Sequence, residues 1–384
     1  MEEHPICDFD FTNCKKLKEV SIGNGTNIEN MNGLKNLSEL QVVALGNFLF
    51  ATNKDISFED MISGLGETYS TDSSYTGSYY NNFIGDISAL KSCKNLRILN
   101  ISHLFSVSSE EFLNLVKNLP NLEEIVGQEI NNAGVYSDEL VEYCEKNNIK
   151  HPFTERSKEI KDKDKEIIAK LITPDMDDKG KVRVLSEYVI DNMVYVDANN
   201  DVKKSWGEAL YNATIYGKGL CFGYAIRTAA LFTEAGIKTG KLEKPGHAFN
   251  YYKVGEEYYY IDLTTLDNIF EEEPELKNII FSNTEKYMWK IDEKFNQKSG
   301  VMAIPAGAIK QIESNNKQSS NSNDYKVLRI IGVLMTLGIA GITSITAINM
   351  KKKYSSKEWK QEEYDHFYEE YSQRDIVSEV DEER

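Results

Sequence analysis

Three residues that together could carry out nucleophilic catalysis follow one another within a short part of the chain: Cys221, His247 and Asp262. A thiol, an imidazole and a carboxylate are the nucleophile, the base and the group that orients the base in cysteine-dependent acyl transfer. A thiol with a pKa of about 8.5 is mostly protonated at neutral pH, so this chemistry requires surroundings that favour the thiolate. We therefore treat these three side chains as candidate catalytic residues.

The segment around Cys221 predicts a helix whose first turn carries the thiol. Gly217-Lys218-Gly219 is a turn signal, and the apolar run from Phe222 to Ala235 contains no proline. Gly236 follows this run and is expected to end the helix. Unpaired backbone N–H groups and the positive end of the helix dipole would then stabilise the Cys221 thiolate.

His247 and Asp262 fall in two predicted strands. The strands are expected at His247–Val254 and Glu257–Thr264, joined by a short turn around Gly255. With a two-residue loop, position 247 faces position 262 or 264, and either register puts His247 and Asp262 on one face of the sheet. A single bulge would reverse this relation.

The residues around the three candidates resemble the transglutaminase-like domain. Its pattern is a G-x-C-x-G-Y-A box, a histidine followed by Ala-aromatic-Asn, and an aspartate in an aromatic-x-x-D-x-T context. Here these boxes read Gly219–Ala225, His247–Asn250 and Tyr259–Thr264, with Phe249 where the family usually has tryptophan. The stretch Lys179–Tyr195 is similar to the helix that opens this domain, so the resemblance covers about residues 170–290.

This resemblance implies a papain-related fold and a Cys-His-Asp triad. Cys221 would be the nucleophile, His247 the general base and acid, and Asp262 the residue that orients the imidazole. The family includes proteases and amidases, which transfer the acyl group to water, and transglutaminases, which transfer it to an amine. The second oxyanion donor is left open, with Trp206 and Asn212 as candidates beside the backbone N–H of Cys221.

The first 150 residues contain a weak repeat. Four stretches place an apolar residue at every third position, beginning at Cys14, Leu34, Cys93 and Leu119, at spacings of 20, 59 and 26 residues. Two of these spacings fall within the range of leucine-rich repeats, and residues 69–82 read as an inserted surface loop. We expect a short leucine-rich-repeat-like solenoid that could bind a protein ligand. The alternative is an ordinary helical region, because L-x-x-L spacing also suits a helix face.

Composition excludes several classes of partner and site. The chain has 384 residues and a net charge of −17, which argues against nucleic acid as a partner. Its five cysteines form no C-x-x-C pair and no zinc-like spacing. We therefore expect no disulfide framework, no metal site and no cofactor.

The remaining segments suggest a linker, a membrane span and a tail. Residues 151–170 read as a solvated charged helix or linker, and 311–326 as a polar linker after a transglutaminase-like domain at 171–310. Residues 327–350 include nineteen consecutive uncharged residues, followed by lysines, which predicts a single membrane-spanning helix. The acidic tail 351–384 receives no function.

Two rules disagree about which side of the membrane the catalytic domain would occupy. The lysines after the predicted span place the tail inside and the catalytic domain outside the cell. The N-terminus, however, has no basic start and no apolar core typical of a signal peptide, which favours a cytosolic domain.

The sequence thus predicts an α/β multidomain chain: an N-terminal leucine-rich-repeat-like solenoid, an α+β papain-like transglutaminase-like domain and a C-terminal single transmembrane helix. The leading hypothesis is a membrane-anchored, bacterial-type cysteine protease, amidase or transglutaminase that acts on a protein or peptide. One alternative is a catalytically inactive membrane-anchored scaffold that binds through its repeats. A further alternative is a redox-sensing Cys221, although the sequence has no nearby resolving cysteine.

Overall fold

The computed structural model describes residues 9–22, 27–45, 83–101, 107–127, 133–196, 209–244, 247–282 and 288–291, together with 308 and 311. The chain divides into two compact units, Met1–Lys317 and Gln318–Arg384, and every described residue belongs to the first unit. The predicted loop at 69–82, the predicted membrane span at 327–350 and the acidic tail at 351–384 lie outside the described residues.

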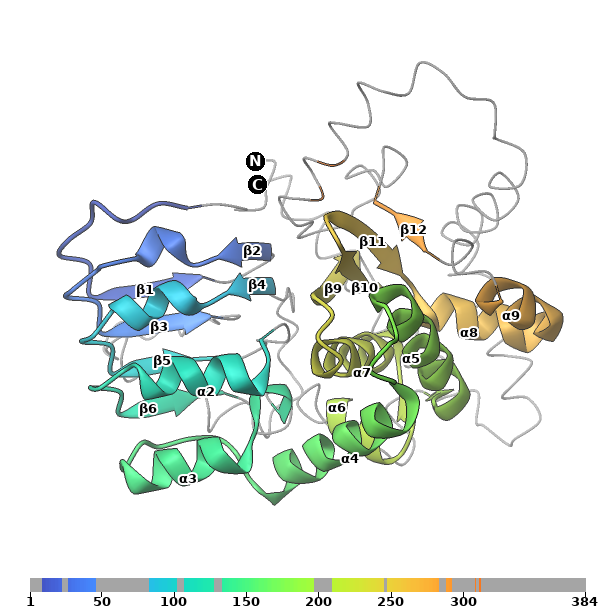
Figure 1. Ribbon diagram of the computed structural model, residues 1–384, viewed down its shortest axis with the longest axis horizontal. Helices are drawn as coiled ribbons and strands as arrows, with labels where there is room; N and C mark the ends of the chain where they lie inside the picture. Colours follow the sequence, from blue (N-terminus) through green and yellow to red (C-terminus); the bar gives the residue numbers. More distant parts are fainter. Residues whose placement is uncertain are drawn as a thin grey trace, which may run out of the picture. The chain divides into compact units, whose positions relative to one another are not determined.

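The N-terminal third contains a four-stranded parallel sheet whose strands pair in chain order (Figure 1). Its strands are β1 (Glu19–Ile22), β3 (Val42–Leu45), β5 (Ile98–Asn100) and β6 (Glu124–Val126). A second parallel pair is formed by β2 (Asn27–Asn30) and β4 (Phe83–Asp86), each followed by a short 3-10 helix, η1 (Asn32–Leu34) and η2 (Ser88–Ser92).

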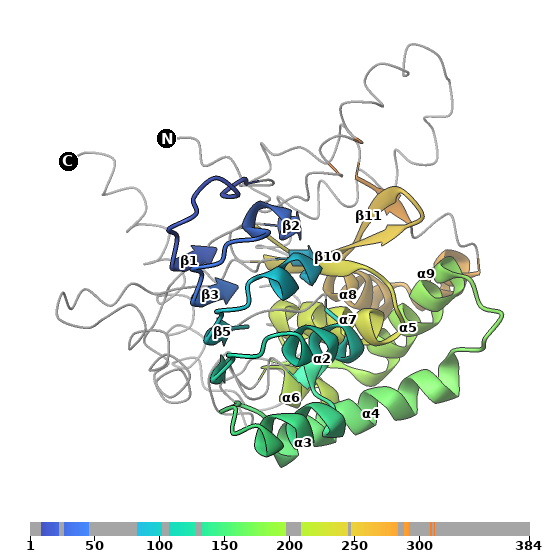
Figure 2. The same ribbon diagram turned by 60° about the vertical axis from the view of Figure 1, so that its left-hand side comes forward.

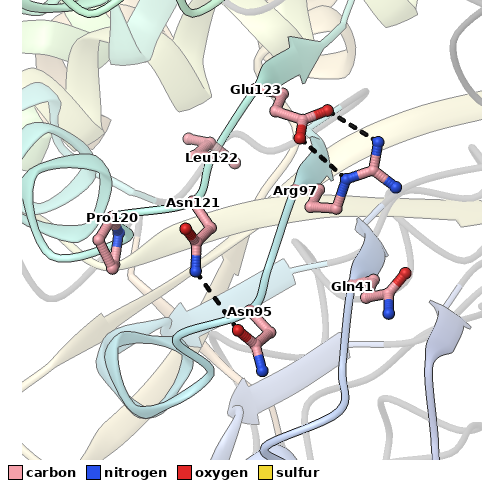
Figure 3. Close-up of a pocket in the computed structure, with 7 residues that line it drawn as sticks. All are labelled: Gln41, Asn95, Arg97, Pro120, Asn121, Leu122 and Glu123. Atoms are coloured by element: carbon pink, nitrogen blue, oxygen red, sulfur yellow. Dashed lines mark hydrogen bonds and ion pairs between the residues drawn. The ribbon is translucent and has the colours of Figure 1, made fainter.

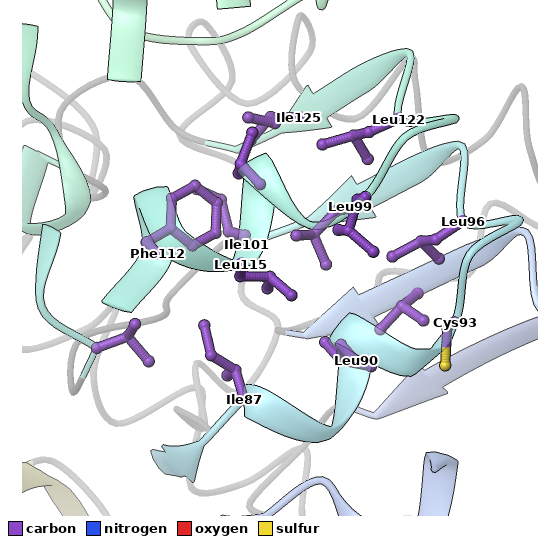
Figure 4. Packing of buried hydrophobic residues seen from close by; sticks show 14 of the residues in the cluster. Ile87, Leu90, Cys93, Leu96, Leu99, Ile101, Phe112, Leu115, Leu122 and Ile125 are labelled. Atoms are coloured by element: carbon purple, nitrogen blue, oxygen red, sulfur yellow. The ribbon is translucent and has the colours of Figure 1, made fainter. Parts of the chain in front are cut away.

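The regularly spaced apolar residues of this region form its core. Leu34, Leu37 and Leu40 are fully buried, as are Leu96 and Leu99. Figure 4 shows the side chains of β5 and β6 packing against those of η2 and α2 (Ser109–Lys117). Helix α3 (Asp138–Lys146) and η3 (Ala133–Val135) complete this part of the chain. The apolar spacing therefore marks core positions in three of the four stretches, and the exposed Cys14 of the first stretch is an exception.

The expected fold class needs correction. The described residues form a mixed α/β structure, and it does not show the expected solenoid. The strands of the four-stranded sheet alternate with members of a second sheet at β2 and β4, and the connections differ, with 3-10 helices in some and α2 in another. Unequal units of this kind do not establish the uniform stacking that a repeat array requires.

The expected membrane localisation is also contradicted. None of the described helices combines the length and the apolar composition needed to cross a bilayer. The longest of them, α4 (Glu155–Leu171), has 17 residues and consists largely of Lys, Glu and Asp, which are costly to place in hydrocarbon.

The second half of the described chain is built around an antiparallel sheet with the order β12-β11-β10-β9. Helix α7 packs across this sheet beside β10, with α5 and α8 against α7 (Figure 2). The elements are α5 (Asp178–Asn192), β7 (Val194–Tyr195), α6 (Ala209–Ile215), β8 (Lys218–Gly219), α7 (Cys221–Glu234), β9 (Thr239–Lys244), β10 (His247–Val254), β11 (Glu257–Ile261), α8 (Leu263–Glu272), α9 (Pro274–Phe281) and β12 (Trp289–Lys290).

The composition of helix α4 suggested a fully solvated connection, but part of this helix is buried. Its Lys161 and Asp164 are buried and form ion pairs with Glu234 and Arg227 of α7. Lys161 Nζ also donates to the carbonyl of Gly134, 3.0 Å away, in η3. Buried charges are tolerated when they are paired in this way, so α4 is part of the framework that holds α7.

Candidate active site

Cys221 is the first residue of α7, as the sequence predicts. The loop before it is held by β7 and β8, where Val194 N–H donates to the carbonyl of Gly217, 2.8 Å away. Gly217 has a φ of +61°, and a β-carbon there would collide with the carbonyl oxygen of Asn192. The turn that delivers Cys221 to the helix N-terminus therefore requires glycine at this position.

The far end of α7 is closed by Gly236, also as predicted. Gly236 has a φ of +80°, and its N–H donates to the carbonyl of Thr233 while that of Ile237 donates to Phe232. These two bonds satisfy the last carbonyls of the helix in a Schellman motif. Since the first turn of α7 contains no acidic residue, its N-terminus keeps the positive potential that favours a thiolate at Cys221.

His247 is the first residue of β10, whose bounds match the prediction. Val254 pairs with Glu257 across a two-residue loop that begins at Gly255, where φ is +59°. Continued by one residue beyond Asn250 and Ile261, this register sets position 249 opposite position 262, on the face that also carries His247. This register agrees with the expected facing of the two residues, although Asp262 lies one residue beyond β11.

Asp262 differs from the prediction in its local structure. The strand was expected to continue to Thr264, but β11 ends at Ile261 and Asp262 is the N-cap of α8. Its Oδ1 accepts a hydrogen bond from the backbone N–H of Thr265 at 3.0 Å, and its Oδ2 accepts one from Thr265 Oγ1 at 2.8 Å. An aspartate in this position satisfies orphan N–H groups of the helix, which favours helix over further strand.

The imidazole of His247 and the carboxylate of Asp262 are in direct contact. His247 Nε2 lies 2.6 Å from Asp262 Oδ2, and the two side chains are only 17% and 11% exposed. The ring of His247 also stacks on Phe249, with centroids 5.9 Å apart and planes 18° from parallel. Because Nε2 is occupied by the carboxylate, Nδ1 is the nitrogen that can exchange a proton with another group.

That other group is Cys221. Burial alone would raise the pKa of the Cys221 thiol, but a hydrogen bond to His247 and the positive charge of the imidazolium lower it overall. The backbone N–H of Ala248 further stabilises the thiolate. Burial lowers the pKa of His247, but Asp262 and Cys221 more than compensate and raise it to about 10.

The electrostatics of Asp262 fit the same arrangement. Burial raises the pKa of its carboxyl, but the His247 charge and the hydrogen bonds from His247 and Thr265 lower it overall. At pH values between the lowered pKa of Cys221 and the raised pKa of His247, the favoured state is a thiolate beside an imidazolium. This is the reactive state of a cysteine nucleophile.

Three buried hydrogen bonds, absent from the sequence prediction, hold the supporting elements together. Asn250 Nδ2 donates to the carbonyl of Ala225 at 2.9 Å, which joins β10 to α7, and also to the carbonyl of Gly240 at 3.2 Å in β9. Tyr224 OH donates to Asp267 Oδ2 at 2.6 Å, which joins α7 to α8. Tyr224 and Asn250 lie in the sequence boxes that carry the resemblance, and Asp267 lies 43 residues from Tyr224.

Of the two side chains proposed as the second oxyanion donor, the structure describes only Asn212. Asn212 lies on α6 and is 8% exposed, and α6 packs against α7. Trp206 lies outside the described residues.

The other described cysteines have different surroundings. Cys93 and Cys144 are buried, and burial raises the pKa of both thiols. Cys14 is exposed, although its place in the repeat predicted a core position. Buried thiols of this kind are held in the unreactive, protonated form, in contrast to Cys221.

A separate pocket lies in the N-terminal third, away from the triad residues. It has a volume of about 550 Å³ and is formed where the chain enters β3, β5 and β6 (Figure 3). Arg97 and Glu123 form a two-pronged ion pair on one side, at 3.0 and 2.8 Å, and Asn121 donates to Asn95 on the other. The lining residues are Gln41, Asn95, Arg97, Pro120, Asn121, Leu122 and Glu123.

Comparisons with known proteins give a likeness to solved structures. No protein-family model matches the chain, and no curated protein matches its sequence. A solved structure described as "Crystal structure of a TGase" superposes on 34% of this chain with 19% sequence identity and a TM-score of 0.25. The match covers 38% of the length of that chain.

Proposed function

We propose that this chain is a cysteine acyl-transfer enzyme that acts on protein or peptide amides. The observation that carries the proposal is the contact of His247 with Asp262 at 2.6 Å, together with the place of Cys221 at the N-terminus of α7, where the charge of His247 lowers the pKa of the thiol. A nucleophile, a base and an orienter in this order generate a reactive thiolate. The three sequence boxes that resemble the transglutaminase-like domain support the same reading.

The first half of the reaction would be acylation of Cys221. The thiolate attacks the amide carbonyl carbon and forms a carbon–sulfur bond, and the carbonyl electrons move to oxygen. When the tetrahedral intermediate collapses, the carbon–nitrogen bond breaks and His247 gives its Nδ1 proton to the leaving nitrogen. The products of this step are a thioester on Cys221, a free amine or ammonia, and a neutral imidazole.

The second half would transfer the acyl group to an acceptor. Neutral His247 removes a proton from water or from an amine, which attacks the thioester and releases Cys221 as the thiolate. Water as acceptor gives a protease or amidase, and an amine gives a transglutaminase. Asp262 stabilises the imidazolium that forms in this step and keeps the ring in the required orientation.

Turnover assays with the Cys221→Ala variant test this proposal. Conversion of glutamine to glutamate or new amino termini in a glutamine-containing protein reports hydrolysis, and incorporation of a fluorescent primary amine reports transfer. We expect the wild type to support at least one reaction and Cys221→Ala to support neither while it retains its unfolding temperature. Cys93→Ala is a matched control, because it removes a buried thiol of raised pKa. Equal turnover by Cys221→Ala and the wild type would contradict the proposal.

A second candidate function is partner binding by the N-terminal third, which the pocket of Figure 3 favours. Its amide and ion-pair groups offer donors and acceptors suited to a peptide backbone. Gln41→Lys and Asn121→Lys place long charged side chains at the pocket. If the pocket binds peptides, both variants lose affinity for peptides selected with the wild-type chain, and alkylation of Cys221 is unchanged. Unchanged affinity in both variants would exclude this pocket as the binding site.

A further inference from the structure

Two of the three triad residues lie at helix N-termini, and one buried hydrogen bond connects those two helices. Cys221 is the first residue of α7, and Asp262 is the N-cap of α8. Tyr224 lies one helical turn after Cys221, and Asp267 lies in the second turn of α8. The hydroxyl of Tyr224 donates to Asp267 Oδ2 over 2.6 Å.

The surroundings of this bond make it strong and specific. Tyr224 is 1% exposed and Asp267 is 9% exposed, so water competes little for either group. Burial and the neighbouring Asp267 carboxylate raise the pKa of the Tyr224 hydroxyl, which keeps it protonated as a donor. A hydrogen bond from a neutral donor to a buried carboxylate is among the stronger side-chain interactions.

The bond lies where it controls the geometry of the triad. His247 is held to α7 on its own strand through Asn250, which donates to the carbonyl of Ala225. Asp262 follows β11 directly and moves with α8, whose second turn is tied to α7 by Tyr224 and Asp267. A shift of α8 along α7 would therefore carry the Asp262 carboxylate away from His247 Nε2.

We propose that Tyr224 and Asp267 are positioning residues: their hydrogen bond fixes the helix that carries Asp262 against the helix that carries Cys221, and so maintains the contact of Asp262 with His247. The inference rests on the proposed function of the triad. It assigns to the tyrosine of the G-x-C-x-G-Y-A box a role in geometry that is separate from any contact with a substrate.

The test compares Tyr224→Phe with a variant that loses the same kind of bond elsewhere. Tyr136→Phe is suitable, because Tyr136 OH donates to Asp138 Oδ1 at 2.7 Å in the N-terminal third. Asp267→Asn keeps a side-chain oxygen that can accept the hydroxyl of Tyr224 and serves as the conservative variant. For each full-length protein, iodoacetamide alkylation of the Cys221 peptide is measured by mass spectrometry between pH 5 and 9, with the unfolding temperature.

We expect Tyr224→Phe to react at least about tenfold more slowly than the wild type at pH 6.5, because small displacements of catalytic groups are costly. The pH midpoint of its alkylation should move upward. Tyr136→Phe should keep the wild-type profile, and Asp267→Asn should lie closer to the wild type than Tyr224→Phe does. A change in midpoint is not produced by a loss of stability alone, so it separates positioning from a merely structural role.

Two negative outcomes are distinguishable. If the wild type shows an activated thiolate and Tyr224→Phe has the same profile as the wild type, the positioning role is wrong and the proposed function stands. If the wild-type thiol itself reacts like an ordinary cysteine, with a midpoint near 8.5 and no dependence on His247, the proposed function fails and this inference fails with it. Equal decreases in Tyr224→Phe and Tyr136→Phe would also overturn the positioning role.

Discussion

Replacing Asp262 by asparagine removes one negative charge from the site and changes the shape of the side chain very little. The carboxylate lies 2.6 Å from His247 Nε2 and is the main reason that the pKa of His247 is raised to about 10 despite burial. Asparagine caps helices about as well as aspartate, and its Oδ1 can still accept the N–H of Thr265. The substitution thus tests electrostatics while α8 retains its N-cap.

The expected magnitude follows from the ionisation of Cys221. Without the Asp262 charge, His247 loses the largest interactions that raise its pKa while burial still lowers it, so we expect a smaller imidazolium fraction at pH 6.5. The thiol then loses the imidazolium that lowers its pKa, while burial raises it. A thiol with a pKa of about 8.5 is about 1% ionised at pH 6.5, and the higher nucleophilicity of the more basic thiolate offsets part of that loss. We expect alkylation to slow by about 10- to 100-fold at this pH.

Alkylation of the Cys221 peptide by iodoacetamide, followed by mass spectrometry from pH 5 to 9, measures the effect. The wild type should react quickly at pH values between the lowered pKa of Cys221 and the raised pKa of His247, since the ion pair persists there. Asp262→Asn should instead show a rate that rises with pH through the range of an ordinary thiol. Superimposable profiles for the two proteins would refute the claim that Asp262 sustains the ion pair.

Two further substitutions test the framework around the site. Asn250→Ala removes the bonds to the carbonyls of Ala225 and Gly240, and should lower the free energy of unfolding by about 1–3 kcal/mol and slow Cys221 alkylation at pH 6.5. Chemical denaturation measures the free energy of unfolding. An unchanged alkylation rate would contradict the claim that the Asn250 link between β10 and α7 supports the site. Arg227→Met leaves Asp164 without its buried partner and should cost about 3–5 kcal/mol in the same denaturation experiment. Adding Asp164→Leu should recover most of this loss, and a double variant as unstable as Arg227→Met would contradict the pairing.

The local features of the site could be predicted because their causes are local. Gly217, Gly236 and Gly255 each have a positive φ, and each marks a turn or helix end that the sequence already indicated. Alternating strand positions and a two-residue loop were sufficient to place His247 and Asp262 on one face. The end of β11 was misplaced because Asp262 can continue a strand or cap a helix, and only the packed structure decides between the two.

The parts that could not be predicted depend on contacts between distant residues. Helix α4 reads as a solvated charged segment, but Asp164 meets Arg227 and Lys161 meets Glu234, which are 63 and 73 residues away. The bond between Tyr224 and Asp267 spans 43 residues and connects a family box to a position outside it. No periodicity within one segment reveals partners at such separations.

The expected membrane span is not supported by the part of the chain that the structure describes. The prediction rested on a single uncharged run of nineteen residues within 327–350, which lies outside the described residues. None of the helices that the structure describes has the length and composition of a membrane span.

The central claim is that Cys221 and His247 form an activated pair, and the pH dependence of Cys221 alkylation in the wild type and in His247→Ala tests it most directly. The account predicts rapid alkylation of the wild type that persists well below pH 7, because the pKa of Cys221 is lowered by His247, and loss of this rapid reaction in His247→Ala. A slow wild-type rate with a midpoint near the ordinary thiol value of about 8.5, unaffected by His247→Ala, would contradict it.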